Sequence, residues 1–191
     1  MIKRGEALRR VLEVLDRLKI PYFVHGSLAS AAHGIGRSTQ DADFVADLTQ
    51  NQLGDLIAEL QRDFYADPRI ITGAFECGQQ FNLVHFATGF KIDILPLTND
   101  PFSRMQFSRR RCIQLTLRGE PVECAIASAE DTILSKLRWF KIGGQSSTTQ
   151  WHDVWGIVQV QRDHLDYAYL REWAPKLGIA DLLERLLRES S

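Results

Sequence analysis

The segment "HGSLASAAHGIGRSTQDADF", residues 25–44, joins a glycine-serine turn to a pair of acidic residues. The residues "YFVH" before the turn are typical of an apolar strand that ends at Gly26, and the small residues after Ser27 favour a short helix. From Asp41 onward, polar and apolar residues alternate as in a half-buried strand. Because successive side chains of a strand point to opposite faces, we expect Asp41 and Asp43 to share one face.

A third acid, Asp93, interrupts the apolar segment "KIDIL". If Ile92 and Ile94 point into the core, Asp93 points to the other face, where a carboxylate needs a partner or a metal ion. Mg²⁺ prefers oxygen ligands, and two such ions can hold both the attacking and the leaving oxygen of a displacement at phosphorus. The three acids therefore favour a site for two Mg²⁺ ions, with Mn²⁺ as an alternative.

The glycine-serine turn has the features of a phosphate site. Gly26 lets the backbone approach a phosphate closely, Ser27 offers a hydroxyl, and the N-terminus of the following helix offers unpaired N–H groups. An ordinary turn with Ser27 as a helix N-cap is the alternative.

Composition sets the general class. A chain of 191 residues, 45% of them hydrophobic, is long enough to bury a sizeable core. No apolar run reaches the roughly 18 residues of a membrane span, and the amphipathic N-terminus is unlike a signal peptide. The three cysteines do not form a disulfide framework. We therefore expect a cytoplasmic protein without a membrane partner. A net charge of -1 gives no general nucleic-acid signature, although Arg109–Arg111 form a local basic run, which is either a nucleic-acid contact or a solvated edge.

The remaining periodicities predict an α+β fold, with a mixed β-sheet core and flanking helices in residues 1–126 and a small helical region in residues 127–191. Amphipathic helices are expected at both sides of the opening segment, at residues 5–18 and 49–62. Strands are expected at residues 69–78, 81–88, 90–97, 111–119 and 121–126, and helices at residues 128–144, 150–161, 166–178 and 180–190.

Taken together, the turn at Gly26-Ser27, the pair Asp41-x-Asp43 and the later Asp93 resemble the pattern of the nucleotidyltransferase superfamily related to DNA polymerase β. The resemblance covers roughly residues 22–155 and is strongest to the small bacterial branch that includes AbiEii-type and MenT-like toxins. Further matches are Arg37-Ser38-Thr39, Glu130-Asp131, Lys136 and Asp153. The chain departs from the branch in a longer segment between Ser27 and Asp41, and in Gln150-Trp151-His152, where the branch commonly has Arg, Lys and Asp.

The resemblance implies specific roles. Asp41 and Asp43 would hold the metal ions, and Asp93 would complete the second metal site and help to deprotonate the attacking hydroxyl. The nucleotide-binding residues implied by the resemblance are Gly26, Ser27, Arg37 and Lys136.

The expected activity is metal-dependent transfer of an NMP from an NTP such as ATP to a hydroxyl acceptor, with release of pyrophosphate. By the same resemblance, the acceptor is a tRNA or a protein in a toxin-antitoxin setting, with a partner protein encoded nearby. The alternative is a catalytically silent nucleotide-binding or antitoxin-like partner module on the same fold.

Overall fold

The computed structural model describes residues 4–36, 39–117 and 120–190. The chain divides into two compact units, one of Met1–His25 with Thr39–Ile126 and one of Gly26–Ser38 with Ala127–Ser191. The short segment between the first two strands thus belongs with the C-terminal helices. The predicted domain boundary between residues 126 and 127 stays a prediction.

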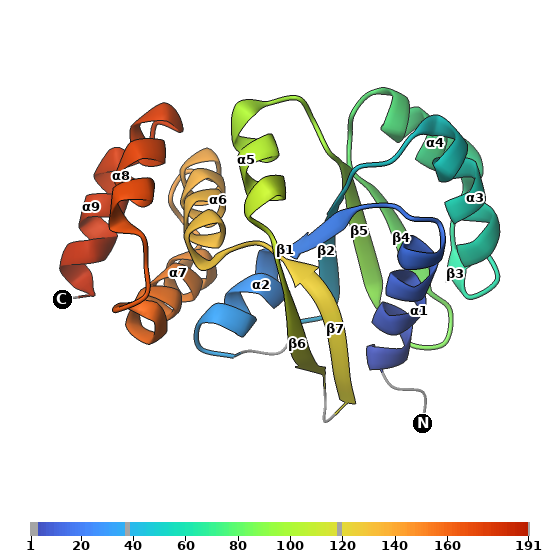
Figure 1. The fold of residues 1–191 in the computed structure, drawn as a ribbon, viewed down its shortest axis with the longest axis horizontal. Helices are drawn as coiled ribbons and strands as arrows, with labels where there is room; N and C mark the ends of the chain where they lie inside the picture. The colour runs from blue at the N-terminus through green and yellow to red at the C-terminus, as the bar shows by residue number, and fades with distance from the viewer. Residues whose placement is uncertain (1–3, 37–38, 118–119, 191) are drawn as a thin grey trace. The chain divides into compact units, whose positions relative to one another are not determined.

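The first unit is built on a mixed β-sheet, whose described strands run in the order β3-β4-β5-β2-β1-β7-β6 (Figure 1). The pairs β1/β7 and β2/β5 are parallel, and β1/β2, β3/β4, β4/β5 and β6/β7 are antiparallel. The α+β fold class predicted from the sequence is therefore confirmed. The strands are β1 (Tyr22–His25), β2 (Asp41–Ala46), β3 (Phe64–Tyr65), β4 (Phe81–His85), β5 (Lys91–Pro96), β6 (Arg111–Leu117) and β7 (Glu120–Ile126).

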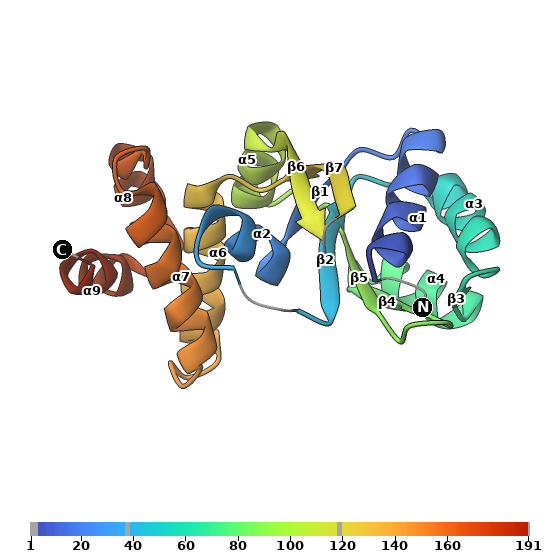
Figure 2. The same cartoon turned by 90° about the horizontal axis from the view of Figure 1, so that it is seen from below.

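Helices cover both faces of this sheet. The helices α1 (Arg4–Arg17), α3 (Gln50–Leu60) and α4 (Pro68–Glu76) lie together on one side in two perpendicular views (Figures 1 and 2). On that side the apolar halves of the strands form the core, with Phe44, Ile92 and Ile94 fully buried.

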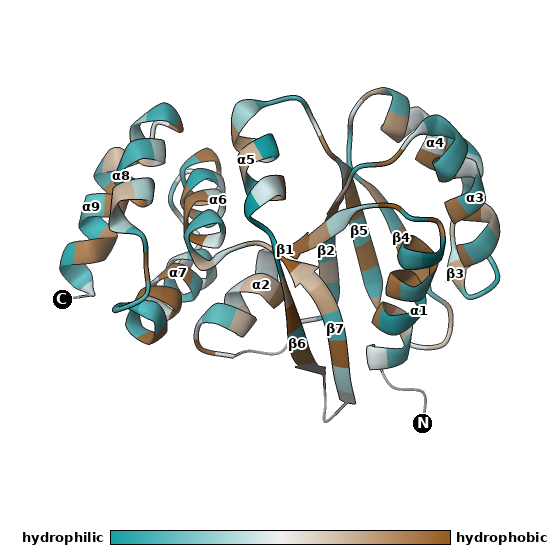
Figure 3. Cartoon of the chain, viewed as in Figure 1, coloured by the Kyte–Doolittle hydropathy of each residue, from teal (hydrophilic) through white to brown (hydrophobic). Residues whose placement is uncertain are grey.

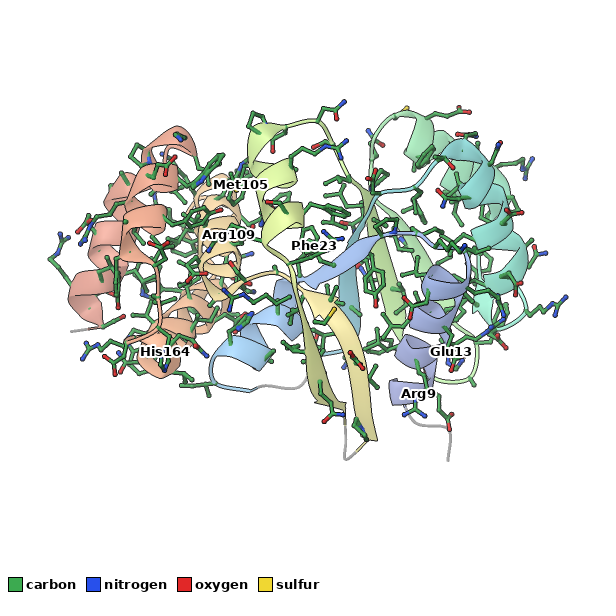
Figure 4. All side chains as sticks on the ribbon, in the orientation of Figure 1. Arg9, Glu13, Phe23, Met105, Arg109 and His164 are labelled. Atoms are coloured by element: carbon green, nitrogen blue, oxygen red, sulfur yellow. The ribbon has the colours of Figure 1, made fainter. Side chains whose placement is uncertain are left out.

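The opposite face carries α5 (Pro101–Arg109). The Phe107 ring of this helix lies against the Phe23 ring of β1, with centroids 6.2 Å apart, and Figure 4 shows Phe23 beside α5. Phe23 alternates along β1 with Tyr22, whose ring contacts Phe44 of the core, so Phe23 and Phe107 mark the second face.

One helix replaces a predicted strand, and another lies where the sequence predicted no element. Residues 69–78 were expected to form a strand, but α4 occupies Pro68–Glu76. Asp67 caps this helix by accepting hydrogen bonds from the backbone N–H groups of Arg69 and Ile70, and Pro68 stands in its first turn. The unexpected α5 begins in the same way, with Asp100 as N-cap before Pro101. An Asp-Pro pair favours a helix start, and in α4 it outweighs the β-branched residues that follow.

Side chains cap two further helices at their N-termini. Thr49 caps α3 in a capping box with Gln52, and Ser128 caps the first C-terminal helix by accepting from the N–H of Asp131. The strands β4 and β5 pair as an antiparallel hairpin. The alternation of hydrophilic and hydrophobic residues is visible along the strands and helices in Figure 3.

The second unit consists of helices in its described part. These are α2 (Gly26–His33), α6 (Ala129–Ile142), α7 (Thr148–Gln161), α8 (Tyr167–Lys176) and α9 (Ala180–Glu189). The end of α2 is fixed to α7, because Gln161 Nε2 donates to the His33 carbonyl at 3.0 Å. Gly34 lies so close to α7 that a Cβ atom there would stand 2.7 Å from the Ile157 backbone nitrogen.

Within the described residues, no helix has both the length and the apolar character that crossing a membrane requires. The three cysteines Cys77, Cys112 and Cys124 are free thiols.

The contact at Gly34 gives a stability prediction. Gly34→Ala should lower the free energy of unfolding of the second unit by about 1–3 kcal/mol, because the added methyl meets backbone that cannot move aside. All four tryptophans of the chain belong to this unit, so urea unfolding followed by tryptophan fluorescence measures the effect. Gly36→Ala is the matched control, since in the described part of the chain no atom beyond its neighbours lies within 4 Å of its added Cβ. Equal midpoints for the two variants would contradict the assignment.

Candidate active site

The predicted acidic face is present in the first unit. Asp41 and Asp43 alternate along β2 with the fully buried Ala42 and Phe44. In the parallel pair β2/β5, Asp43 stands directly beside Asp93. Residues that are paired in this way point to the same side of a sheet, so the three carboxylates share the face opposite the main core.

The edge of this face is held by local hydrogen bonding. Thr39 Oγ1 donates to Asp41 Oδ1 at 2.5 Å, which fixes the first carboxylate just where the loop enters β2. On the other side of β2, His25 of β1 stands opposite Asp43 in the antiparallel register. The acids thus lie over the middle of the sheet, where the strands on both sides fix the backbone.

Asp93 is the most buried of the three acids, with 3% of its surface exposed. Lys91 Nζ forms an ion pair with its Oδ2 at 2.6 Å. The second oxygen, Oδ1, is buried and has no hydrogen-bond partner among the described residues. A buried carboxylate oxygen without a donor is unfavourable, so this atom is a position where a ligand would be stabilised.

The electrostatics of the face converge on Lys91. Its pKa is raised above the ordinary value, first by the hydrogen bond to Asp93 and then, against partial desolvation, by the charges of Asp93, Asp41 and Asp43. In the parallel pair β2/β5, Lys91 is the partner of Asp41, and Asp93 is the partner of Asp43. One ammonium group therefore lies in the field of three carboxylates.

The donor set suits a hard divalent cation, since it consists of carboxylate oxygens, one of them buried and unpaired. In residues 4–36, 39–117 and 120–190, however, no three His, Cys, Asp or Glu side chains form an arrangement that could hold a metal ion. Lys91 engages Asp93 instead. A metal site formed by the three carboxylates therefore stays a prediction. The residue types suit a divalent cation, but the side chains, Lys91 among them, would have to rearrange to bind one.

The glycine-serine turn follows β1 directly in the chain. Gly26 has φ +65°, a backbone conformation that side chains with a Cβ rarely adopt, and it begins α2. Ser30 Oγ hydrogen-bonds to the carbonyl oxygens of Gly26 and Ser27 at 3.2 and 3.0 Å, which stabilises the first turn of the helix. The predicted nucleotide-binding residue Arg37 lies outside the described residues.

Lys136 lies in the second unit and is buried. Its Nζ forms an ion pair with Asp153 Oδ2 at 2.8 Å, between α6 and α7.

Two acids in the first turn of α6 bind α8. Asp131 is fully buried and accepts a hydrogen bond of 2.6 Å from the Tyr169 hydroxyl of α8. The Glu130 carboxylate accepts from the N–H of Asp166, the N-cap of α8. The acids that the sequence singled out here join the helices of the unit to one another.

Sequence reasoning missed two polar neighbours of Asp93. Lys91 precedes it by two residues, and Asn82 of β4 stands opposite it in the antiparallel register. The spacing of Lys91 was a usable signal, because the alternation that places Asp93 on the polar face places Lys91 there too. Asn82 depends on the register of β4 and β5, which the sequence did not reveal.

The chain matches no family model, and it matches no sequence among the curated proteins. Solved structures are similar in fold. An antigenic nucleotidyltransferase-like protein from Paracoccidioides brasiliensis has a TM-score of 0.53 and 18% identity, over 94% of this chain and 93% of that one. The antibiotic-resistance factor ANT(2'')-Ia has a TM-score of 0.51 and 14% identity, over 97% and 92% of the two chains. The lincosamide antibiotic adenylyltransferase LnuA has a TM-score of 0.50 and 14% identity, over 83% and 98%. The chain thus has the fold of nucleotidyltransferase-like proteins.

The buried pair of Lys136 and Asp153 gives the second prediction. Lys136→Met should destabilise the second unit by about 3–5 kcal/mol, because it removes the ammonium that neutralises the buried Asp153 charge. Tryptophan fluorescence during urea unfolding measures the loss. The double variant Lys136→Met/Asp153→Asn removes that charge as well and should recover most of the stability. A single variant as stable as the parent would show that the pair does not hold α6 and α7 together.

Proposed function

We propose that this protein is a metal-dependent nucleotidyltransferase that moves an NMP from an NTP to a hydroxyl acceptor and releases pyrophosphate. The observation that carries the proposal is the in-register pairing of Asp43 with Asp93, with Asp41 on the same face. Like charges directly opposite each other on neighbouring strands are destabilising, so a cluster of this kind needs a cation. The fold shared with nucleotidyltransferase-like proteins supports the same conclusion.

The residues of the chain take defined roles in the proposal. Asp41 and Asp43 would hold the cations, and Asp93 would complete the second cation site and help to deprotonate the acceptor hydroxyl. Gly26 and Ser27 contact phosphate oxygens through the backbone and the hydroxyl. Divalent cations at this site would supply charge stabilisation of the triphosphate. In the transfer, the acceptor oxygen forms a bond to the α-phosphorus, and the bond from that phosphorus to the bridging oxygen of pyrophosphate breaks.

The positive side chains complete the nucleotide site in this proposal. Arg37 and Lys136 neutralise triphosphate charge. Lys136 donates one hydrogen bond to Asp153 through its ammonium group. Asp153 then keeps the ammonium in place.

The acceptor class follows from the sequence resemblance alone. A tRNA or a protein hydroxyl in a toxin-antitoxin setting, with a neighbouring gene encoding the partner, is the acceptor we propose to test first. Two proteins of similar fold are an antibiotic-resistance factor, ANT(2'')-Ia, and a lincosamide antibiotic adenylyltransferase, LnuA. A small antibiotic is therefore the next acceptor to test.

One observation favours a second candidate function. Lys91 already neutralises Asp93, and a lysine held in that position would suit a module that binds nucleotide without turnover. Calorimetry with each NTP and Mg²⁺, combined with a pyrophosphate assay, separates the candidates. Binding without pyrophosphate release in the presence of cell RNA, lysate protein and antibiotics would favour the silent module.

The third prediction concerns catalysis. Incubation with α-labelled NTPs, Mg²⁺ and cell RNA or lysate should transfer label to an acceptor fraction. Asp41→Asn/Asp43→Asn should reduce the transfer at least about a hundredfold, because the charge stabilisation at the α-phosphate is lost. The matched control is Asp55→Asn, an exposed carboxylate of α3 on the other side of the sheet, which should leave transfer unchanged. Transfer that persists in the double variant would refute the catalytic assignment.

A further inference from the structure

The ion pair between Lys91 and Asp93 is asymmetric. The Lys91 side chain is 43% exposed, whereas the Asp93 side chain is 4% exposed. The ammonium contacts Oδ2, and no other described residue gives the buried Oδ1 a hydrogen bond. The pair therefore neutralises the Asp93 charge but satisfies only half of its carboxylate.

The position of Lys91 allows it to leave. It is the first residue of β5, and its four-carbon stem reaches the carboxylate from a half-exposed site. A lysine ammonium is a compact point charge on a flexible chain, so it can turn into solvent without any change in the strand backbone. Asp93, in contrast, is held in the middle of the sheet between β2 and β4.

If Lys91 left without a replacement, the three carboxylates would face one another with one of them buried. A buried charge without a partner is strongly unfavourable. The ammonium is thus stable at Asp93 until another cation arrives, and a divalent cation would satisfy both carboxylate oxygens where the ammonium satisfies one.

We propose that Lys91 is an internal counter-ion of the acidic face, which occupies the cation position at Asp93 and is displaced when a divalent cation binds. The inference rests on the proposed function, because it needs the three aspartates to bind that cation. Lys91 then acts as a positioning residue: it holds the Asp93 carboxylate in place through the ion pair, and it lowers the affinity of the metal-free protein for the cation at this position by competing for Oδ2.

The test is the binding of Mn²⁺ alone, in the absence of nucleotide, measured by calorimetry on the full chain. Lys91→Met should bind Mn²⁺ about fivefold more tightly than the parent, because the cation no longer has to break the ion pair with Lys91. A factor of about five is the upper end of what one exposed ion pair contributes. Lys91→Arg keeps a cation at Asp93 and should bind as the parent does. Lys176→Met is the matched control, since it removes an exposed lysine that pairs with Glu172 at 2.7 Å in the second unit.

A second readout does not depend on affinity. Without metal, Lys91→Met should melt at a lower temperature than the parent, because the carboxylates repel one another without their counter-ion. Saturating Mn²⁺ should raise its melting temperature by more than it raises that of the parent. If Lys91→Met does not fold, Lys91→Gln, which is neutral but keeps a hydrogen-bond donor, takes its place in both measurements.

Failure of this inference is distinct from failure of the proposed function. If the parent binds Mn²⁺ and loses it in Asp41→Asn/Asp43→Asn, but Lys91→Met binds no more tightly than the parent, the counter-ion role is wrong and the metal site remains. If neither the parent nor Lys91→Met binds Mn²⁺, both the counter-ion role and the proposed metal site are refuted.

Discussion

The parallel register of β2 against β5 is the constraint from which the candidate site follows. It is fixed by the apolar faces of the two strands, because Phe44 pairs with Ile94 and both are fully buried. A slip by one residue would turn these side chains to the polar face and bury the acids. Core packing therefore places Asp43 beside Asp93 regardless of the repulsion between them, and the same hydrophobic side chains that stabilise the unit maintain a charge cluster that needs a cation.

The opening segment of the sequence is divided between the two units of the fold. The chain leaves the first unit after His25, forms α2 against α6 and α7, and returns to the sheet at Thr39. The phosphate-type turn therefore belongs to the helical unit, and the acids belong to the sheet unit.

Periodicity predicted the elements whose signal is local. The alternation around Asp41 and Asp93 was sufficient to place both on one face of the sheet. The helix α4 was mistaken for a strand because its β-branched residues were given more weight than the Asp-Pro pair before it. The partner of Lys136 was missed for a different reason: burial of a lysine against Asp153 depends on how α6 and α7 pack, which is a tertiary property.

The most direct test of the acidic face is a crystal structure of the protein with Mn²⁺ and a non-hydrolysable NTP analogue, with the ion located by its anomalous scattering. The account predicts Mn²⁺ coordinated by Asp41, Asp43 and Asp93, with the Lys91 ammonium turned away from Oδ2 of Asp93. Manganese bound elsewhere on the chain, with the Lys91 and Asp93 ion pair intact, would contradict it.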